Sequence, residues 1–165
     1  MPDLVLSNSF GPNIGMALAD ITQAVEESSL KQMNSTCEKM KKLNDDIGIL
    51  QDYMHCLKQA AALGQGLNLT TSQEAQESHS KAAQVLIDHG YPENFLSSDP
   101  PPNTVESEAE SLETVIRTLM NKQTPDQLTF KATHETLMMK LKTLGKILDM
   151  FNELNKTSIH KFRNG

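Results

Sequence analysis

His55 and Cys56 are adjacent in the sequence and carry imidazole and thiol groups, both of which bind metal ions in proteins. The apolar pattern around them predicts a helix, and adjacent positions of a helix do not face one another. No second pair of histidines or cysteines with metal-ligand spacing accompanies them. We therefore expect no metal site and no bound cofactor.

The other ionisable residues do not form a catalytic pattern. Glu106, Glu108 and Glu110 alternate around a predicted helix, so their carboxylates do not converge as an acid/base pair. His134 falls on an apolar helix face, where a histidine is more often structural than a ligand. The sequence contains no glycine-rich phosphate loop, no G-x-S-x-G and no H-E-x-x-H. We expect that the protein is not an enzyme.

The elements that position these groups are long helices. Thr124 to Gln127 forms a capping-box pattern with Pro125 at the first helical position, which predicts a helix start. From there to about His160, apolar residues recur at spacings of mainly four and three, as in a coiled-coil seam. The seam residues are Phe130, Leu137, Leu141, Leu144, Leu148 and Phe151, and Ile147, Met150 and Leu154 widen the stripe on one flank. Such a helix needs a long partner to cover its stripe.

Residues 30–63 provide this partner. Two apolar seams follow one another along them and differ by a shift of phase near residues 40–47, which resembles a stammer. The first contains Leu30, Met33, Cys37, Met40 and Ile47, and the second contains Leu43, Ile47, Leu50, Met54, Leu57 and Ala61. The pattern ends at Leu63–Gly64. A capping-box spacing at Ser29 and Gln32 allows either a helix start there or one helix that runs through.

The predicted organisation has four parts. Residues 1–13 are expected to be a flexible segment, because they contain prolines and a glycine, and residues 14–63 to form an amphipathic helix. Residues 64–103 form a variable middle with one short helix, from Thr71 to His89–Gly90, and a proline-rich loop. Residues 104–165 carry the C-terminal helices, with a turn or a kink at residues 121–125. The predicted fold is all-α, with two long helices packed as an antiparallel coiled-coil hairpin around this short insertion.

The formal net charge of −6 is distributed unevenly. Residues 1–29 carry −4, residues 30–63 carry +1, residues 64–113 carry −8 and residues 114–165 carry +5. The acidic middle and the basic end could attract one another within one chain or between copies. An acidic chain with only 4% aromatic residues is not expected to bind nucleic acid.

Cys37 and Cys56 would lie roughly 28 Å apart along one continuous helix, which is beyond the reach of a disulfide. Both are expected to be small core residues. The sequence has no run of apolar residues long enough to span a membrane, so we expect no integral membrane segment. The first 30 residues lack the lysines and arginines of a secretory signal or a mitochondrial presequence.

Three stretches carry a resemblance to a known family. They are Asn8–Gly11, the short helix Val85–Leu96 (VLIDHGYPENFL) and the terminal run Leu137–Phe162. Together with the layout of the helices, they resemble the secreted filament-forming translocator proteins of type III secretion systems, the EspA/SseB family. The resemblance implies a protein that is cytoplasmic before export and reaches the bacterial surface without a cleavable signal peptide. It also implies polymerisation through the terminal helices, a dedicated helical secretion chaperone and contacts with other secretion-apparatus proteins.

We therefore expect a homo-oligomer, a filament or translocator component that helps to deliver effectors to host cells. Self-association and chaperone binding are assigned to two sets of seam residues. They are Leu137, Leu141, Leu144, Leu148 and Phe151, packed against Met40, Ile47, Leu50, Met54 and Leu57. Two alternatives stay open: an intracellular helical adaptor or chaperone with a closed bundle, and an injected effector.

Overall fold

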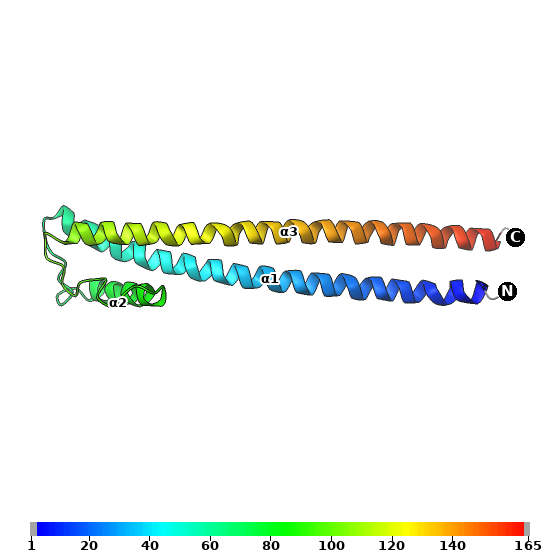
Figure 1. The fold of residues 1–165 in the computed structure, drawn as a ribbon, viewed down its shortest axis with the longest axis horizontal. Helices are drawn as coiled ribbons and strands as arrows, with labels where there is room; N and C mark the ends of the chain where they lie inside the picture. Colours follow the sequence, from blue (N-terminus) through cyan, green and yellow to red (C-terminus); the bar gives the residue numbers. More distant parts are fainter. Residues whose placement is uncertain (1–2, 164–165) are drawn as a thin grey trace. The chain divides into compact units, whose positions relative to one another are not determined.

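Three α-helices and no strand make up the described part of the chain (Figure 1). The computed structural model describes the backbone of residues 3–163 and the side chains of residues 16, 17 and 19–163. The helices are α1 (Asp3–Ala62), α2 (Gln73–Asp88) and α3 (Val105–Arg163). The predicted all-α class is confirmed.

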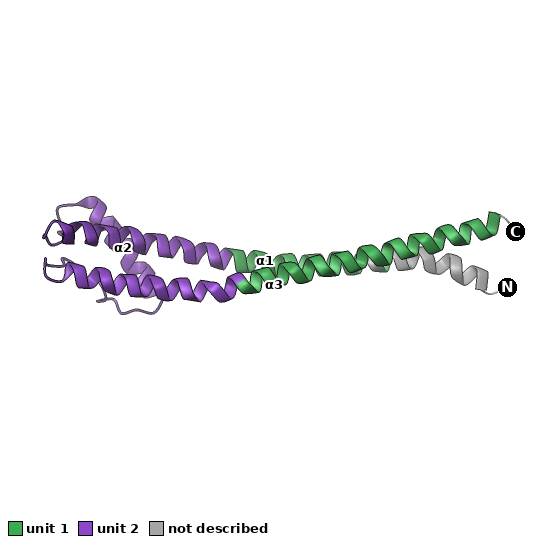
Figure 2. Ribbon diagram, turned by 90° about the horizontal axis from the view of Figure 1, so that it is seen from above, with its two compact units in different colours: residues 1–37, 128–165 green, residues 38–127 purple. Residues whose placement is uncertain are grey.

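The helices belong to two compact units (Figure 2). Unit 1 contains Met1–Cys37 and Leu128–Gly165, and unit 2 contains Glu38–Gln127. Each long helix therefore contributes one stretch to each unit, whereas α2 belongs to unit 2 alone.

The helix α1 begins at Asp3 and passes Ser29 without a break. The flexible segment expected over residues 1–13 is therefore helical from residue 3 onward, and residues 1 and 2 lie outside the described residues. Starting a helix is costly, whereas each residue added to an existing helix gains a hydrogen bond. The gain from extending the helix therefore outweighs the local preference of residues such as Gly11 and Pro12 for turns.

The less exposed positions of α1 from residue 22 onward include one uninterrupted heptad repeat. Its members are Thr22, Glu26, Ser29, Met33, Thr36, Met40, Leu43, Ile47, Leu50, Met54, Leu57 and Ala61. The predicted phase shift near residues 40–47 is wrong, because Ser29 and Thr36 occupy the seam while Leu30 and Cys37 are exposed beside it. A search for apolar periodicity does not detect polar residues at seam positions.

The helix α3 runs from Val105 through Pro125 to Arg163, so the predicted helix start at Thr124 is wrong. A proline inside a helix removes one backbone hydrogen bond and crowds the preceding turn. Less exposed residues continue on both sides of it at helical spacing, with Leu119 and Gln123 before and Asp126 and Phe130 after. We infer that this repeat keeps the chain helical where the local capping pattern predicts a start.

The middle segment is tied together by specific backbone contacts. The hydroxyl of Ser72 caps α2 by accepting a hydrogen bond from the backbone N–H of Ala75, one residue later than the Thr71 cap that the sequence predicts. After α2 the chain turns at Gly90, which has a φ of +87° and confirms the predicted end. The loops before and after α2 meet at Gly66, where a Cβ atom would lie 2.8 Å from the carbonyl oxygen of Pro100.

Unit 2 has a closed hydrophobic core shared by α1, α2 and α3. The buried core residues are Ile47, Leu50, Tyr53, Leu57, Ala60, Ala82, Val85, Leu86, Leu96, Val105, Ala109, Leu112, Val115, Ile116 and Leu119. Polar contacts at its edges join the same helices. His89 of α2 lies 2.9 Å from Asp46 of α1, and the Gln123 amide of α3 donates a 2.7 Å hydrogen bond to Asn44 of α1.

Unit 1 is packed much more loosely than unit 2. Among its described side chains, Leu137 is the only hydrophobic residue that is buried. The 16–37 stretch of α1 and the 128–163 stretch of α3 therefore hold one another through half-exposed side chains. We conclude that, among the described side chains, apolar burial is concentrated in unit 2.

This contrast predicts different costs for the same substitution in the two units. Leu112→Ala removes a fully buried side chain of unit 2 and should lower the free energy of unfolding of unit 2 by about 2–5 kcal/mol. Leu148→Ala, at a side chain of unit 1 that is 41% exposed, should cost about 1 kcal/mol or less. Both tyrosines of the chain, Tyr53 and Tyr91, lie in unit 2, so tyrosine fluorescence follows the urea unfolding of this unit, and circular dichroism follows the helices of both units. Equal losses for the two variants would contradict the assignment of the core.

Candidate association surface

The exposed apolar side chains of the protein are concentrated in unit 1. Of the fifteen large apolar side chains that are exposed in the described part of the chain, twelve belong to unit 1. Nine of the twelve lie on α3, and they are Leu128, Met138, Met139, Ile147, Leu148, Met150, Leu154, Ile159 and Phe162. The candidate functional surface is therefore the 137–162 stretch of α3.

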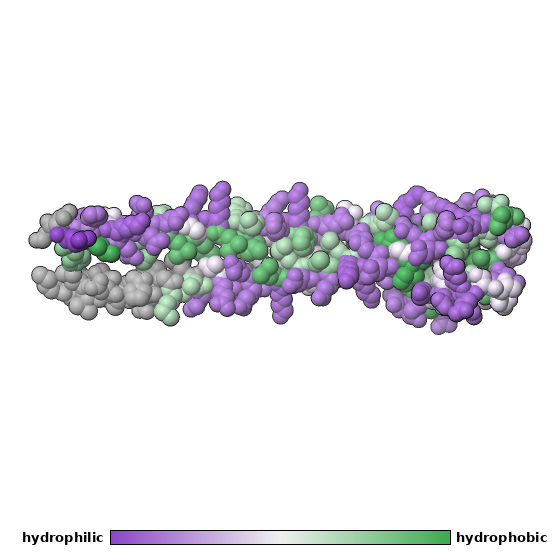
Figure 3. All heavy atoms as spheres, turned by 180° about the vertical axis from the view of Figure 1, so that it is seen from behind, coloured by the Kyte–Doolittle hydropathy of each residue, from purple (hydrophilic) through white to green (hydrophobic). Residues whose placement is uncertain are grey.

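Helical spacing sorts these side chains into a centre and two flanks. Leu137, Leu144 and Phe151 recur every seven residues and are buried or half-buried, so they form the centre. Flank 1 consists of Ile147, Met150 and Leu154, which are 40–65% exposed, and flank 2 consists of Met138, Leu148, Ile159 and Phe162, which are 41–68% exposed. Figure 3 shows a band of hydrophobic side chains bordered by hydrophilic ones. A stripe of this width is broader than the two-position seam that one facing helix covers.

The facing stretch of α1 has a polar seam. Thr22, Glu26, Ser29 and Thr36 occupy four of its half-buried heptad positions, and only Met33 among them is a large apolar residue. Polar residues at seam positions lower the stability of a helix pair. The pairing inside unit 1 therefore leaves the apolar surface of α3 incompletely covered.

The structure divides the ten predicted association residues between the two units. Leu137, Leu141, Leu144, Leu148 and Phe151 belong to unit 1, whereas Met40, Ile47, Leu50, Met54 and Leu57 belong to unit 2. Ile47, Leu50 and Leu57 are buried in the core of unit 2, Met54 packs against it, and Met40 is half-buried. The prediction that Ile47, Leu50 and Leu57 form part of an association surface is therefore wrong, because these residues are buried in the core of unit 2.

The reason for this correction is that α3 has a second apolar stretch, which packs in the same core. Leu112 and Leu119 lie in that core with Leu50 and Leu57. The periodicity of one helix shows which of its faces is apolar but does not show which other stretch covers that face.

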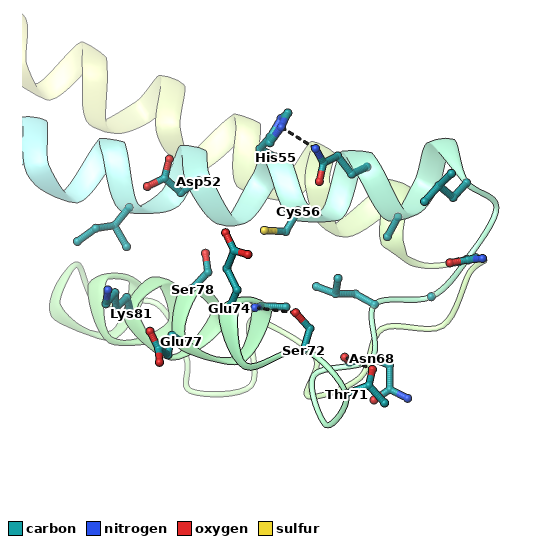
Figure 4. Close-up of a pocket in the computed structure, with 18 residues that line it drawn as sticks. Asp52, His55, Cys56, Asn68, Thr71, Ser72, Glu74, Glu77, Ser78 and Lys81 are labelled. Atoms are coloured by element: carbon teal, nitrogen blue, oxygen red, sulfur yellow. Dashed lines mark hydrogen bonds between the residues drawn. The ribbon is translucent and has the colours of Figure 1, made fainter.

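Unit 2 also contains a groove that the sequence did not indicate. It lies between α1, the loop of residues 65–72 and α2, and has a volume of about 880 Å³ (Figure 4). Its charged residues are Asp52, Glu74, Glu77 and Lys81, and its apolar residues are Ile49, Ala60, Leu63, Leu67 and Ala75. The groove is therefore acidic with an apolar component.

Cys56 lines this groove without a catalytic partner. Its sulfur lies between α1 and α2 on the side of Glu74 and Ser78, whereas His55 points in a different direction (Figure 4). The His55 Nε2 atom lies 3.0 Å from the amide nitrogen of Gln59. Burial, and next the negative charge of Glu74, raise the pKa of the Cys56 thiol. The predicted absence of a facing His–Cys pair agrees with this geometry, and Cys37, expected in the core, is instead exposed.

Tyr53, His79 and Glu108 are polar residues that pack in or beside the core of unit 2. The ring of Tyr53, which is fully buried, packs edge-on against the ring of His79, with 5.3 Å between the ring centroids. Burial, and next the negative charge of Glu108, raise the pKa of Tyr53 well above its ordinary value, so the phenol stays protonated. Glu108 is itself buried and accepts a 3.1 Å hydrogen bond from the backbone N–H of Ser97. This arrangement fixes the start of α3 to the preceding loop.

The described residues offer neither a metal cluster nor a membrane span. No group of three or more histidine, cysteine, aspartate or glutamate side chains among them could hold a metal ion. None of the described helices combines the length and the apolarity that crossing a membrane requires.

The apolar stripe of α3 could be predicted from the sequence, whereas the groove and the exposure of flank 2 could not. The capping pattern near Thr71 placed the start of α2 to within one residue. Which face of α2 meets α1 depends on side chains such as His79 and His89, whose contacts are not visible as a periodic pattern. No protein-family model, curated protein or solved structure matches this chain.

The two cysteines should differ in their reaction with maleimide reagents. Cys37 is exposed, whereas Cys56 is half-buried and has a raised pKa, so less of it is thiolate at a given pH. We expect the single-thiol variant Cys56→Ser, which keeps Cys37, to react at least about tenfold faster at pH 7.5 than Cys37→Ser, which keeps Cys56. Because its pKa is raised, the Cys56 rate should continue to increase above the pH at which an ordinary thiol is fully ionised. Equal rates measured by mass spectrometry would contradict this environment for Cys56.

Proposed function

We propose that the protein self-associates through the two flanks of α3 in unit 1. The observation that carries this proposal is the exposure of seven large apolar side chains, three in flank 1 and four in flank 2, beside a seam that one helix already faces. Contiguous exposed apolar surface of this kind marks protein interaction sites. Burying one such side chain is favourable by roughly 1.5–3 kcal/mol, so covering the flanks can outweigh the entropy lost on association.

The proposed protomer is an antiparallel hairpin of the two long helices. Contacts within unit 2 support this direction of packing. Asn44 bonds to Gln123 and Lys58 bonds to Glu113, so positions later in α1 meet positions earlier in α3. In this register, residues 22–36 of α1 would face the part of α3 that contains Leu137 and Leu144, and the uncovered flanks would be presented to a second copy.

Charge favours α1 of the second copy as the helix that covers the flanks. The 128–163 stretch of α3 has seven basic and three acidic residues, whereas residues 16–37 of α1 have Asp20, Glu26 and Glu27 against Lys31. Exposed apolar residues of this α1 stretch, Met16 and Leu30, could then pack on the flanks. Reciprocal packing of this kind is an isologous dimer, which buries the same patch on both copies.

A pair of double variants tests association through the flanks. Leu148→Asp with Leu154→Asp places one buried charge in each flank and should raise the dissociation constant at least about tenfold, because an unpaired charge would be desolvated in the interface. Met120→Asp with Leu128→Asp is the matched control, since both residues are exposed but lie outside the flanks. Sedimentation velocity over a concentration series measures the constant, and circular dichroism checks that both variants remain helical. Equal weakening by the control pair, or no weakening by the flank pair, would refute this surface.

We further propose that this self-association serves a type III secretion apparatus, as a filament or translocator component that is exported from the bacterium. The resemblance of Asn8–Gly11, Val85–Leu96 and Leu137–Phe162 to the EspA/SseB family supports this proposal. The uncovered flanks support it independently, because a protein stored before export needs a partner on such a surface, and a helical chaperone would provide one.

Export depends on the first residues in this proposal. A chain that lacks residues 2–20 should fail to appear in the culture medium of the secreting bacterium, while its cytoplasmic level remains comparable to that of the full chain. The control variant Met120→Asp with Leu128→Asp should be exported normally. Undiminished export of the shortened chain would count against the type III proposal. A fixed small oligomer at all concentrations, together with no export of the full chain, would favour the intracellular adaptor instead.

A further inference from the structure

We infer that the last turns of α3 of one copy dock in the acidic groove of unit 2 of a second copy. This inference rests on the proposed function in that the partner is a second copy of the chain. It adds a second surface, the groove of unit 2, none of whose lining residues belongs to the flanks, whereas the docking segment contains Ile159 and Phe162 of flank 2.

The groove combines an apolar lining with a negative charge. Ile49, Ala60 and Ala75 contribute apolar surface from α1 and α2, and Leu63 at the end of α1 is 71% exposed. Asp52, Glu74 and Glu77 outnumber the single cation Lys81, so the formal charge of the lining is negative. These features suit an amphipathic helix with an apolar face and a basic border.

The last turns of α3 have the complementary composition. Ile159 and Phe162 are three residues apart on one helix face and are 62% and 68% exposed. Lys156 and Arg163, seven residues apart, lie along one border of this face, and both are exposed. No acidic residue occurs between Lys156 and Arg163. This segment therefore presents an aromatic and an aliphatic anchor beside two cations.

The two surfaces match in kind and in size. A groove of about 880 Å³ has room for the side chains of Ile159 and Phe162, which would cover the apolar lining. Lys156 and Arg163 would then lie near the carboxylates of Asp52, Glu74 and Glu77. The last carbonyl groups of a helix have no partner within the helix, and Lys81 and the Asn68 amide in the lining can donate to them.

This docking joins copies in an open-ended way. Each copy carries one groove and one C-terminal segment, and the two differ, so the contact is heterologous. A heterologous contact that does not close into a ring continues from copy to copy. The inferred occupant is thus the end of α3 of a second copy and not an unrelated basic peptide.

The test uses full-length chains that already carry Leu148→Asp and Leu154→Asp, so that association through the flanks is removed. The groove variant adds Glu74→Lys and Glu77→Lys, and the end variant adds Lys156→Gln and Arg163→Gln, so that the two altered surfaces do not attract one another. We expect the parent chain to form growing species in sedimentation velocity, and each variant alone to remain at the smallest species. A mixture should form a one-to-one complex without further growth, because the intact groove of the end variant receives the intact end of the groove variant. Failure of the mixture to associate would overturn the inference.

Labelling of Cys56 gives a second readout that does not depend on size. In a Cys37→Ser background, docking covers Cys56 and should slow its reaction with maleimide at least about fivefold as the protein concentration rises through the association range. The end variant should show no slowing, and tyrosine fluorescence should confirm that its unit 2 is folded. Concentration-independent labelling of the parent chain would overturn the inference.

The occupant is tested with a peptide of residues 152–163 and a scrambled peptide of the same composition. The native peptide should protect Cys56 and compete with docking of the parent chain, and the scrambled peptide should not. Equal protection by both would show that the groove accepts basic peptides in general, which would overturn docking of a second copy. If Cys56 is protected while the flank variants of the proposed function associate normally, the proposed flank surface fails and the groove inference stands.

Discussion

A single facing helix covers a seam of two positions per heptad, and this limit leaves apolar surface uncovered in unit 1. The stripe of α3 between Leu137 and Phe162 is wider than a two-position seam, and the half-buried heptad positions described for α1 in the same unit, between Thr22 and Thr36, are mainly threonine, serine and glutamate. The surplus apolar surface must therefore be covered from outside unit 1 or left in contact with water. The proposed contact through the flanks follows from that imbalance.

Unit 2 shows how the same problem is solved within one chain. There the helix α2 supplies a third layer, and side chains such as Leu86 and Val85 complete the core around Leu50 and Leu57. The insertion that interrupts the two long helices is thus a structural element and not a variable loop, since it is fixed by the Ser72 cap and by the close approach of Gly66 to Pro100. Unit 2 is closed where unit 1 is open.

Local sequence signals predicted the elements of this fold but not their partners. The all-helical class, the end of α1 near Gly64 and the end of α2 at Gly90 follow from periodicity and from glycines with positive φ. Thr124 and Ser29 carry capping patterns of the same kind, yet both lie inside continuous helices. Ile47, Leu50 and Leu57 were assigned to association because a buried core seam and an exposed contact seam have the same apolar spacing. The groove was not predicted, because it depends on which faces of α1 and α2 meet.

The two proposed contacts differ in physical character, and this difference separates their roles. Contact through the flanks buries large apolar side chains and would be isologous, so it closes on itself and depends little on salt. Contact between the groove and the end of α3 pairs carboxylates with Lys156 and Arg163 around a single aromatic anchor, so it is weakened by screening at high ionic strength. A closed contact alone gives a dimer, and an open contact alone gives a single strand of copies. A chain that has both can join dimers into an extended assembly if Ile159 and Phe162 lie in the groove and the other flank residues form the dimer contact.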